Sequence, residues 1–115
     1  MPDVFTYLGY LAAKTSRIRL GTAVVTVPLY EPVRVVENLA FVDILSGGRV
    51  MIGLGSGYRP YEFAGFGREF AARHDRQEEA LALILELLHT RRITHQGPFF
   101  HATIAGEYEV FPVSI

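Results

Sequence analysis

Glycines and side chains that could hold a ligand are concentrated between Gly53 and Glu62, in the stretch GLGSGYRPYE. Three alternating glycines end an apolar run, and a hydroxyl, two aromatic rings, a guanidinium and a carboxylate follow. Glycines at the end of a strand either let a ligand approach the backbone or let the strand itself pack closely or turn. Spacing alone favours the second interpretation, and only the surrounding sequence can shift the balance.

Known motifs exclude several kinds of chemistry in this stretch. A GxGxxG fingerprint would require glycine at Tyr58 or at Pro60, and no Gly-Lys-Ser/Thr phosphate loop is present. The chain has no cysteine, and its four histidines form no HExxH pair, so we expect no metal site. The residues by themselves identify no catalytic group.

The elements that must position this stretch alternate between helix and strand. The patterns predict helices at 3–15, 33–46 and 71–91, apolar strands at 18–27 and 50–55, a loop at 56–70, and a tail at 93–115 with one or two short strands. Near-continuous apolar strands between helices are typical of α/β proteins with a parallel sheet. Because two strands do not make a stable parallel sheet, the chain resembles an excerpt from a larger α/β protein.

Length and composition set the remaining limits. The 115 residues suffice for a single domain, 1–115, and 50% of them are hydrophobic, which suggests that some apolar surface is covered by something outside this sequence. A net charge of -1 without a basic patch argues against nucleic acid as a partner. No apolar run reaches the roughly 18 residues of a membrane span. Since residues 1–17 also lack a signal-peptide pattern, we expect a cytoplasmic protein.

Residues 17–67 resemble the bacterial luciferase-like flavin monooxygenase family. The ordered features are a Leu-Gly-Thr strand end, a Pro-x-x-x-Pro-x-Arg loop, a helix ending in Leu-Ser-Gly-Gly-Arg, the Gly-x-Gly-x-Gly strand, and the Glu-Phe and Phe-Gly of the next loop. The helix at 71–91 and the HQGPFF stretch also fit, so the resemblance extends from about residue 3 to Pro112.

The resemblance implies a TIM (β/α)8 barrel, of which this chain would carry about strands 3 and 4 with helices 2 to 4. A complete barrel needs roughly 250 residues, so the barrel is incomplete here. The implied activity is a flavin-dependent monooxygenase, in which reduced FMN and O2 oxygenate a small organic substrate. A separate reductase is one source of the reduced flavin.

The resemblance also implies where the flavin lies, at the carboxyl ends of the two strands. The family often has a non-proline cis peptide at the position of Ala23 and Val24, against the flavin ring. The matching residues of the second strand end and the following loop are Gly55, Ser56, Gly57, Tyr58 and Glu62.

This chain departs from bacterial luciferase in that part of the site. A cysteine near the flavin matches Gly55, and a phosphate-contacting arginine matches Ser56, so the phosphate would lose a charged partner here. The luciferase catalytic histidine lies on a strand with no counterpart in this chain. The catalytic residues and the substrate therefore stay unassigned.

Two alternatives remain open. An F420-dependent oxidoreductase of the same fold would transfer hydride in place of oxygen chemistry, although the GYRPYEF loop looks more like the FMN branch. A non-catalytic half-barrel would instead associate with itself or with a complementary fragment. Helix 33–46 is apolar around most of its circumference, which suggests burial on more than one side and makes it a candidate homodimer face.

Overall fold

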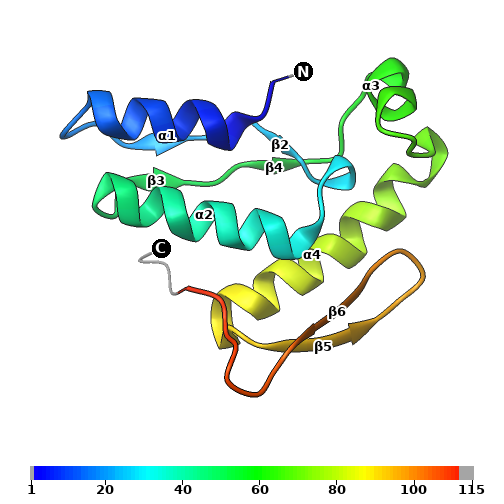
Figure 1. The fold of residues 1–115 in the computed structure, drawn as a ribbon. Coiled ribbons are helices and arrows are strands. Elements are labelled where there is room, and N and C mark those ends of the chain that lie inside the picture. The colour runs from blue at the N-terminus through cyan, green and yellow to red at the C-terminus, as the bar shows by residue number, and fades with distance from the viewer. Residues whose placement is uncertain (1, 112–115) are drawn as a thin grey trace.

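The computed structural model describes residues 2–111, and the last four residues of the predicted tail, 112–115, lie outside them. In chain order the elements are α1 (Val4–Lys14), β1 (Leu20–Gly21), β2 (Val25–Thr26), η1 (Val27–Leu29), α2 (Pro32–Ser46), β3 (Val50–Met51), β4 (Leu54–Gly55), α3 (Pro60–Gly65), η2 (Phe70–Ala72), α4 (Arg73–Thr90), β5 (Ile93–Gln96) and β6 (His101–Ile104) (Figure 1). No helix within residues 2–111 is long and apolar enough to cross a membrane.

The predicted α/β class with parallel strands is confirmed. β1 pairs with β3 and β2 pairs with β4, both in parallel, and α2 makes the crossover between them. Each strand predicted as continuous is interrupted, because three residues of the first, 22–24, lie opposite two of the second, 52 and 53. The extra residue breaks the hydrogen-bond ladder, so each predicted strand forms two short ones.

The helix boundaries follow local signals in the sequence. Asp3 caps α1, and its Oδ2 accepts the Thr6 N–H at 3.0 Å. Pro32 opens α2, where a missing N–H costs nothing, and Gly47 ends it in the left-handed conformation with φ of 68°. The predicted helices at 3–15, 33–46 and 71–91 are confirmed to within two residues at each end.

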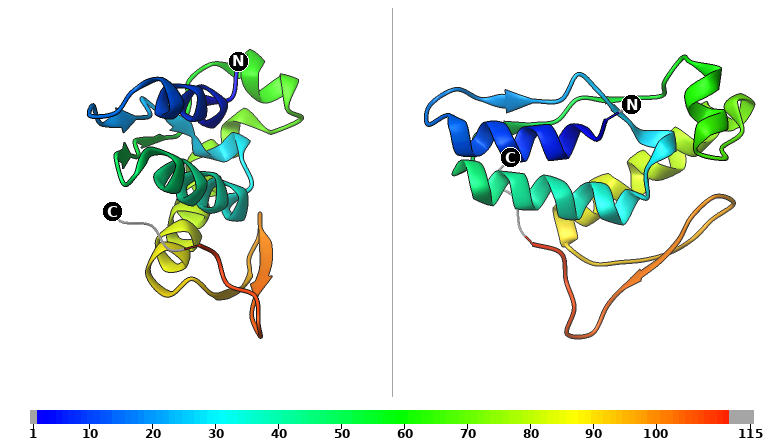
Figure 2. Two further views of the ribbon diagram at one scale, coloured as in Figure 1. Left: turned by 60° about the vertical axis from the view of Figure 1, so that its left-hand side comes forward. Right: turned by 45° about the horizontal axis from the view of Figure 1, so that its top comes forward.

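The helices lie on one face of the parallel strands. α1 and α2 are side by side against β1 and β3, and α4 crosses α2 on the side away from α1 (Figure 2). Side chains that point toward the helices, such as Val25 and Val50, are fully buried. On the opposite face, Val24 is 43% exposed and Met51 is 45% exposed. The molecule measures 40 × 37 × 16 Å, as expected for one layer of helices on one layer of strands.

The prediction of a loop at 56–70 is wrong in part, because this stretch contains α3 and η2. Pro60 occupies the first position of α3, and Phe63 on that helix is only 1% exposed. The Phe63 ring packs edge-on against Phe70, with centroids 5.2 Å apart. A short helix with one buried aromatic anchor lacks the repeated apolar spacing by which helices are predicted.

The amino ends of the parallel strands are tied together by one side chain, Arg49. Its Nε donates to the Ser46 carbonyl at 2.7 Å, and Nη1 donates to Ile18 O and Thr15 Oγ1 at 2.8 and 2.9 Å. Nη2 donates to the carbonyls of Thr15 and Ala12 at 3.0 and 3.1 Å. All five guanidinium N–H groups are thereby used. Arg49 joins the end of α1, the approach to β1 and the end of α2.

The predicted short strands of the tail form an antiparallel hairpin, β5–β6, that packs on α4 (Figure 1). The Glu79 carboxylate of α4 holds its tip. It accepts the N–H of Phe100 at 2.7 Å and that of Phe99 at 3.2 Å, and lies 3.0 Å from His95 Nε2. Gly97 packs closely beside it, since a Cβ there would lie 2.7 Å from the Glu79 carboxylate.

Candidate functional site

A pocket of about 380 Å³ lies where β2 and β4 end and the chain leaves the sheet. One wall comes from the end of the first strand and the other from the residues that lead into α3. We call it the strand-end pocket, and its lining consists of Ala23, Val24, Thr26, Ser56, Gly57, Tyr58, Arg59 and Glu62. The carboxyl ends of parallel strands are the usual ligand-binding edge of α/β folds.

The structure brings together most of the residues predicted to contact the cofactor. Six of the seven line this pocket: Ala23, Val24, Ser56, Gly57, Tyr58 and Glu62. Gly55 is the last residue of β4 and lies just before the pocket wall begins. Two lining residues, Thr26 and Arg59, were not predicted as site residues. Arg59 could have been predicted, because it lies inside the 56–62 stretch that holds other predicted site residues. No sequence signal pointed to Thr26.

The first wall has an unusual backbone. The Ala23–Val24 peptide bond is cis, as the resemblance implies for this position. Both side chains are exposed at this edge, and they present small apolar groups to the pocket. A wall of this kind suits the face of a flat ring better than it suits a bulky, branched ligand.

The alternating glycines are required by contacts within the chain. A Cβ on Gly53 would lie 2.5 Å from the Thr22 carbonyl oxygen, and a Cβ on Gly55 would lie 2.7 Å from Val24 Cγ2. Gly57 has φ of 80°, and a Cβ there would lie 2.7 Å from the Thr26 methyl group. The glycines therefore let the second strand approach the first at alternate positions, as the structural interpretation predicts.

The second wall carries the polar groups. The Arg59 guanidinium lies 4.9 Å from the centre of the Tyr58 ring and 3.7 Å from the Glu62 carboxylate. The Arg59 side chain is 47% exposed, whereas that of Glu62 is 12% exposed. Within residues 2–111 the Ser56 hydroxyl has no hydrogen-bond partner. The wall thus offers a free hydroxyl and a half-exposed cation that contacts the Tyr58 ring and makes one ion pair at 3.7 Å.

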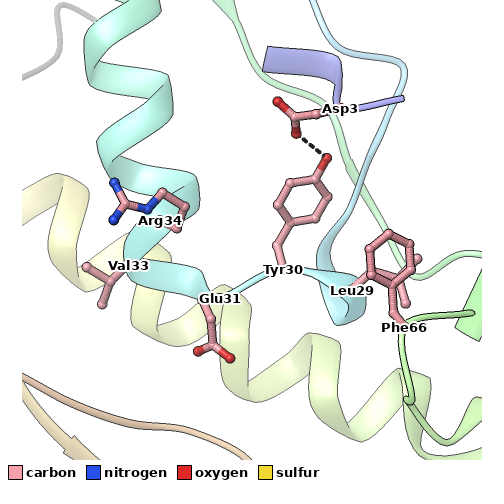
Figure 3. A pocket seen from close by; sticks show the side chains of 7 residues that line it. All are labelled: Asp3, Leu29, Tyr30, Glu31, Val33, Arg34 and Phe66. Atoms are coloured by element: carbon pink, nitrogen blue, oxygen red, sulfur yellow. Dashed lines mark hydrogen bonds between the residues drawn. The ribbon is translucent and has the colours of Figure 1, made fainter. Parts of the chain in front are cut away.

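A second pocket, of about 490 Å³, lies between the amino ends of α1 and α2 (Figure 3). Figure 3 shows the Tyr30 ring standing in its centre, with the hydroxyl directed at Asp3. Tyr30 donates to Asp3 Oδ1 at 2.7 Å, while Oδ2 accepts from Thr6. Burial, followed by this hydrogen bond, raises the pKa of Tyr30. Because the two polar groups at its centre, the Tyr30 hydroxyl and the Asp3 carboxylate, satisfy one another, this pocket is a weaker candidate than the strand-end pocket.

Comparison with known proteins identifies the family of this chain. The model of the luciferase-like monooxygenase family matches residues 1–114. The chain belongs to this family. Over 112 residues, 94% of the chain, it is 35% identical to an F420-dependent glucose-6-phosphate dehydrogenase from Kineococcus radiotolerans. Over 99 residues, 86% of the chain, it is 37% identical to the uncharacterized protein y4vJ of Sinorhizobium fredii.

Solved structures of luciferase-like proteins have the same fold as this chain. Monooxygenase RslO1 from Streptomyces bottropensis matches 98% of the chain with a TM-score of 0.84 and 28% identity. The oxygenating constituent of 3,6-diketocamphane monooxygenase from Pseudomonas putida, in complex with FMN, matches 97% with a TM-score of 0.85 and 17% identity.

The chain is much shorter than the proteins it matches. It covers 28% of y4vJ and 33% of the Kineococcus dehydrogenase, and 32% and 33% of the two solved chains. It therefore spans about a third of their length.

Proposed function

We propose that this chain supplies part of the flavin-binding mouth of a flavin-dependent monooxygenase that uses reduced FMN and O2 to oxygenate a small organic substrate. The observation that carries the proposal is the strand-end pocket, which gathers the predicted cofactor residues at the carboxyl ends of two parallel strands. Family membership and the fold shared with an FMN-bound oxygenase support it.

The residues of the pocket fit a flavin. The small apolar wall at Ala23 and Val24 would lie against the ring, and the Ser56 hydroxyl would donate to a polar group of the cofactor. Arg59 would face an anionic group, with Glu62 holding the guanidinium in place at 3.7 Å. Bound reduced flavin supplies the two electrons needed to activate O2. The chain's own residues bind and orient it, and we assign none of them as a proton donor or acceptor.

A hollow beside the strands and two exposed apolar side chains support a position within a larger barrel, at about strands 3 and 4 with helices 2 to 4. A hollow of about 490 Å³ lies between α1 and the outer edge of β1, lined in part by Tyr7, Leu8 and Gly21. A preceding parallel strand would fit there, and the exposed Val24 and Met51 would then face the barrel interior. Further strands are needed to exclude water, because Tyr58 on the pocket wall is 72% exposed.

An F420-dependent oxidoreductase is the second candidate function. It is favoured by the curated relatives, which at 31–38% identity include several F420-dependent glucose-6-phosphate dehydrogenases. Both cofactors carry a flat tricyclic ring and an anionic tail, so the apolar wall and Arg59 suit either one. The two functions are distinguished by which cofactor binds, and by whether O2 is consumed.

The test is an anaerobic calorimetric titration of the full chain with reduced FMN and, separately, with reduced F420. We expect saturable FMN binding with Kd in the micromolar range. Val24→Glu, which adds a carboxylate to the pocket wall, should abolish binding, whereas Ile18→Glu, at an exposed site before β1, should not. No binding of either cofactor up to millimolar concentration would overturn the proposal, and tighter binding of F420 would favour the second candidate.

We also propose that α2 forms a homodimer face. Phe41, Ile44 and Leu45 make an apolar ridge on it, and each is at least 52% exposed. Light scattering should detect a dimer that Phe41→Glu dissociates and that Leu85→Glu, an exposed site on α4, leaves intact. A monomer at all concentrations would contradict this. A dimer without flavin binding would favour the non-catalytic half-barrel.

A further inference from the structure

The two parallel strands change register just before the strand-end pocket. Gly21 lies opposite Met51 and Val25 lies opposite Leu54, so the first strand carries an extra residue between the paired segments. An insertion of this kind leaves backbone groups without ladder partners and re-aims the residues beside it. Here those residues are Ala23 and Val24, which form one wall of the pocket.

A single side chain bridges this irregularity. Thr22 is 9% exposed, and its Oγ1 accepts the Gly53 N–H at 2.8 Å while donating to the Gly53 carbonyl at 2.8 Å. The same carbonyl accepts the Val25 N–H at 2.8 Å. The Thr22 hydroxyl thus takes the place of a ladder partner for the Gly53 N–H and gives the Gly53 carbonyl a second donor.

The contact between these two residues is also sterically tight. A Cβ on Gly53 would lie 2.5 Å from the Thr22 carbonyl oxygen, so only glycine lets the strands approach this closely. One wall of the pocket begins directly after Thr22, and the other begins at Ser56, three residues after Gly53. This pair, together with the β2–β4 pairing that follows it, therefore sets the separation of the two walls.

We propose that Thr22 is a positioning residue for the flavin site. Its hydroxyl, bonded to both backbone groups of Gly53, fixes the Ala23–Val24 wall relative to the Ser56–Arg59 wall, although Thr22 does not line the pocket itself. This role rests on the proposed function of the strand-end pocket. It predicts that loss of the hydroxyl weakens flavin binding beyond what a general loss of stability would cause.

The test compares three variants of the full chain. Thr22→Val removes the hydroxyl at similar size and leaves the part-buried Gly53 N–H without its partner. Thr22→Ser keeps the hydroxyl. Thr15→Val makes the same chemical change at the amino end of the strands, where Thr15 Oγ1 donates to Leu11 O at 2.7 Å. Each is titrated with reduced FMN under conditions where the variant is fully folded.

We expect Thr22→Val to raise the Kd for FMN about tenfold, Thr22→Ser to restore it to within about threefold, and Thr15→Val to leave it unchanged. The visible circular dichroism of bound flavin should change only in Thr22→Val. Equal affinities and spectra for Thr22→Val and Thr15→Val would overturn the positioning role while the proposed function stands. No FMN binding by the unaltered chain would overturn both.

A measurement on the unaltered chain covers the case in which Thr22→Val fails to fold. Because Gly53 is coupled to both walls through Thr22, flavin binding should slow hydrogen exchange of the Gly53 amide although Gly53 lies outside the pocket. The Leu20 amide, which donates to Arg49 O at the amino end, should exchange at the same rate with and without flavin. Unchanged exchange at Gly53 in the flavin-bound chain would overturn the proposal.

Discussion

The two ends of the same parallel strands differ in how completely their polar groups are satisfied. At the amino end, Arg49 makes five hydrogen bonds of 2.7–3.1 Å, each to an oxygen of this chain. At the carboxyl end, the half-exposed Arg59 makes one ion pair at 3.7 Å and contacts the tyrosines Tyr58 and Tyr61, and Ser56 has no partner among the described residues. Arg49 directly precedes β3 and Arg59 directly precedes α3, but only Arg49 has all its N–H groups bonded to oxygens of the fold.

This difference indicates which end of the strands stabilises the fold and which end keeps polar groups available to a ligand. Side chains whose hydrogen bonds are complete within the fold have nothing left to offer a ligand, whereas a free hydroxyl and a loosely paired guanidinium do. In barrels built from parallel strands, the amino face serves stability and the carboxyl face binds and reacts. Changes at one end should therefore affect unfolding, and changes at the other should affect binding.

The largest effect is expected from Arg49→Ala. It leaves the carbonyls of Ala12, Thr15 and Ser46 without this donor, and hydrogen bonds to a charged group are the stronger kind. We expect the free energy of unfolding to fall by roughly 3 kcal/mol, measured by urea denaturation. The Kd for FMN of the remaining folded molecules should not change.

Arg49→Lys is the matched control. It keeps the positive charge but lacks the planar fork that reaches five acceptors, so it should recover less than half of the lost stability. A loss below about 1 kcal/mol for Arg49→Ala would show that the amino end is not the stabilising end. If Arg49→Ala lost flavin affinity but kept its full stability, the amino end would be the ligand-binding end, which would contradict the assignment of the two ends.

Gly53→Ala should lower both the stability of the chain and its affinity for flavin. The added Cβ would lie 2.5 Å from a backbone oxygen that cannot move aside, so the strands must separate. We expect a loss of about 2 kcal/mol in urea denaturation together with weaker FMN binding. Gly9→Ala is the control, since a Cβ there meets nothing within 4 Å and should stabilise α1 by up to about 1 kcal/mol. A neutral Gly53→Ala would mean that the strands are not in close contact.

The sequence predicted the outlines of this arrangement from local patterns. The helix ranges were predictable because capping, seen at Asp3 and Gly47, depends on neighbouring residues only, and apolar runs predicted both strands. The register change and the bond between Thr22 and Gly53 were not predictable, because they join residues 31 positions apart through a side chain. The glycine pattern indicated close packing, but the partner strand became known only from the structure.

The β5–β6 hairpin lies away from the strand-end pocket. A change there should therefore alter stability without altering flavin binding. Burial opposes ionisation of Glu79, but hydrogen bonds from His95, Phe100 and Phe99 prevail and lower its pKa below the ordinary range. A carboxylate with a lowered pKa stabilises the folded state above its unfolded pKa, and this stabilisation is lost as the pH falls through the lowered value.

Glu79→Gln should therefore cost about 1–2 kcal/mol at pH 7, measured by urea denaturation. The difference from the unaltered chain should shrink as the pH falls from about 4.5, because protonated Glu79 then resembles glutamine. FMN affinity at pH 7 should stay the same, since the hairpin lies away from the strand-end pocket. A difference that is constant from pH 7 to pH 3 would contradict the role of the ionised carboxylate.

Arg59→Gln should have the smallest effect on stability and the most selective effect on binding. The Arg59 side chain is 47% exposed and its ion pair with Glu62 is long, so urea denaturation should detect no change. If the guanidinium faces the phosphate of FMN, the Kd for FMN should rise about fivefold while that for riboflavin, which lacks the phosphate, stays constant. Arg59→Lys should keep part of the preference for FMN. Equal losses of affinity for FMN and riboflavin would instead place Arg59 against the flavin ring. The carboxyl end would then recognise the shape of the ring, and the proposed recognition of the phosphate charge would be wrong.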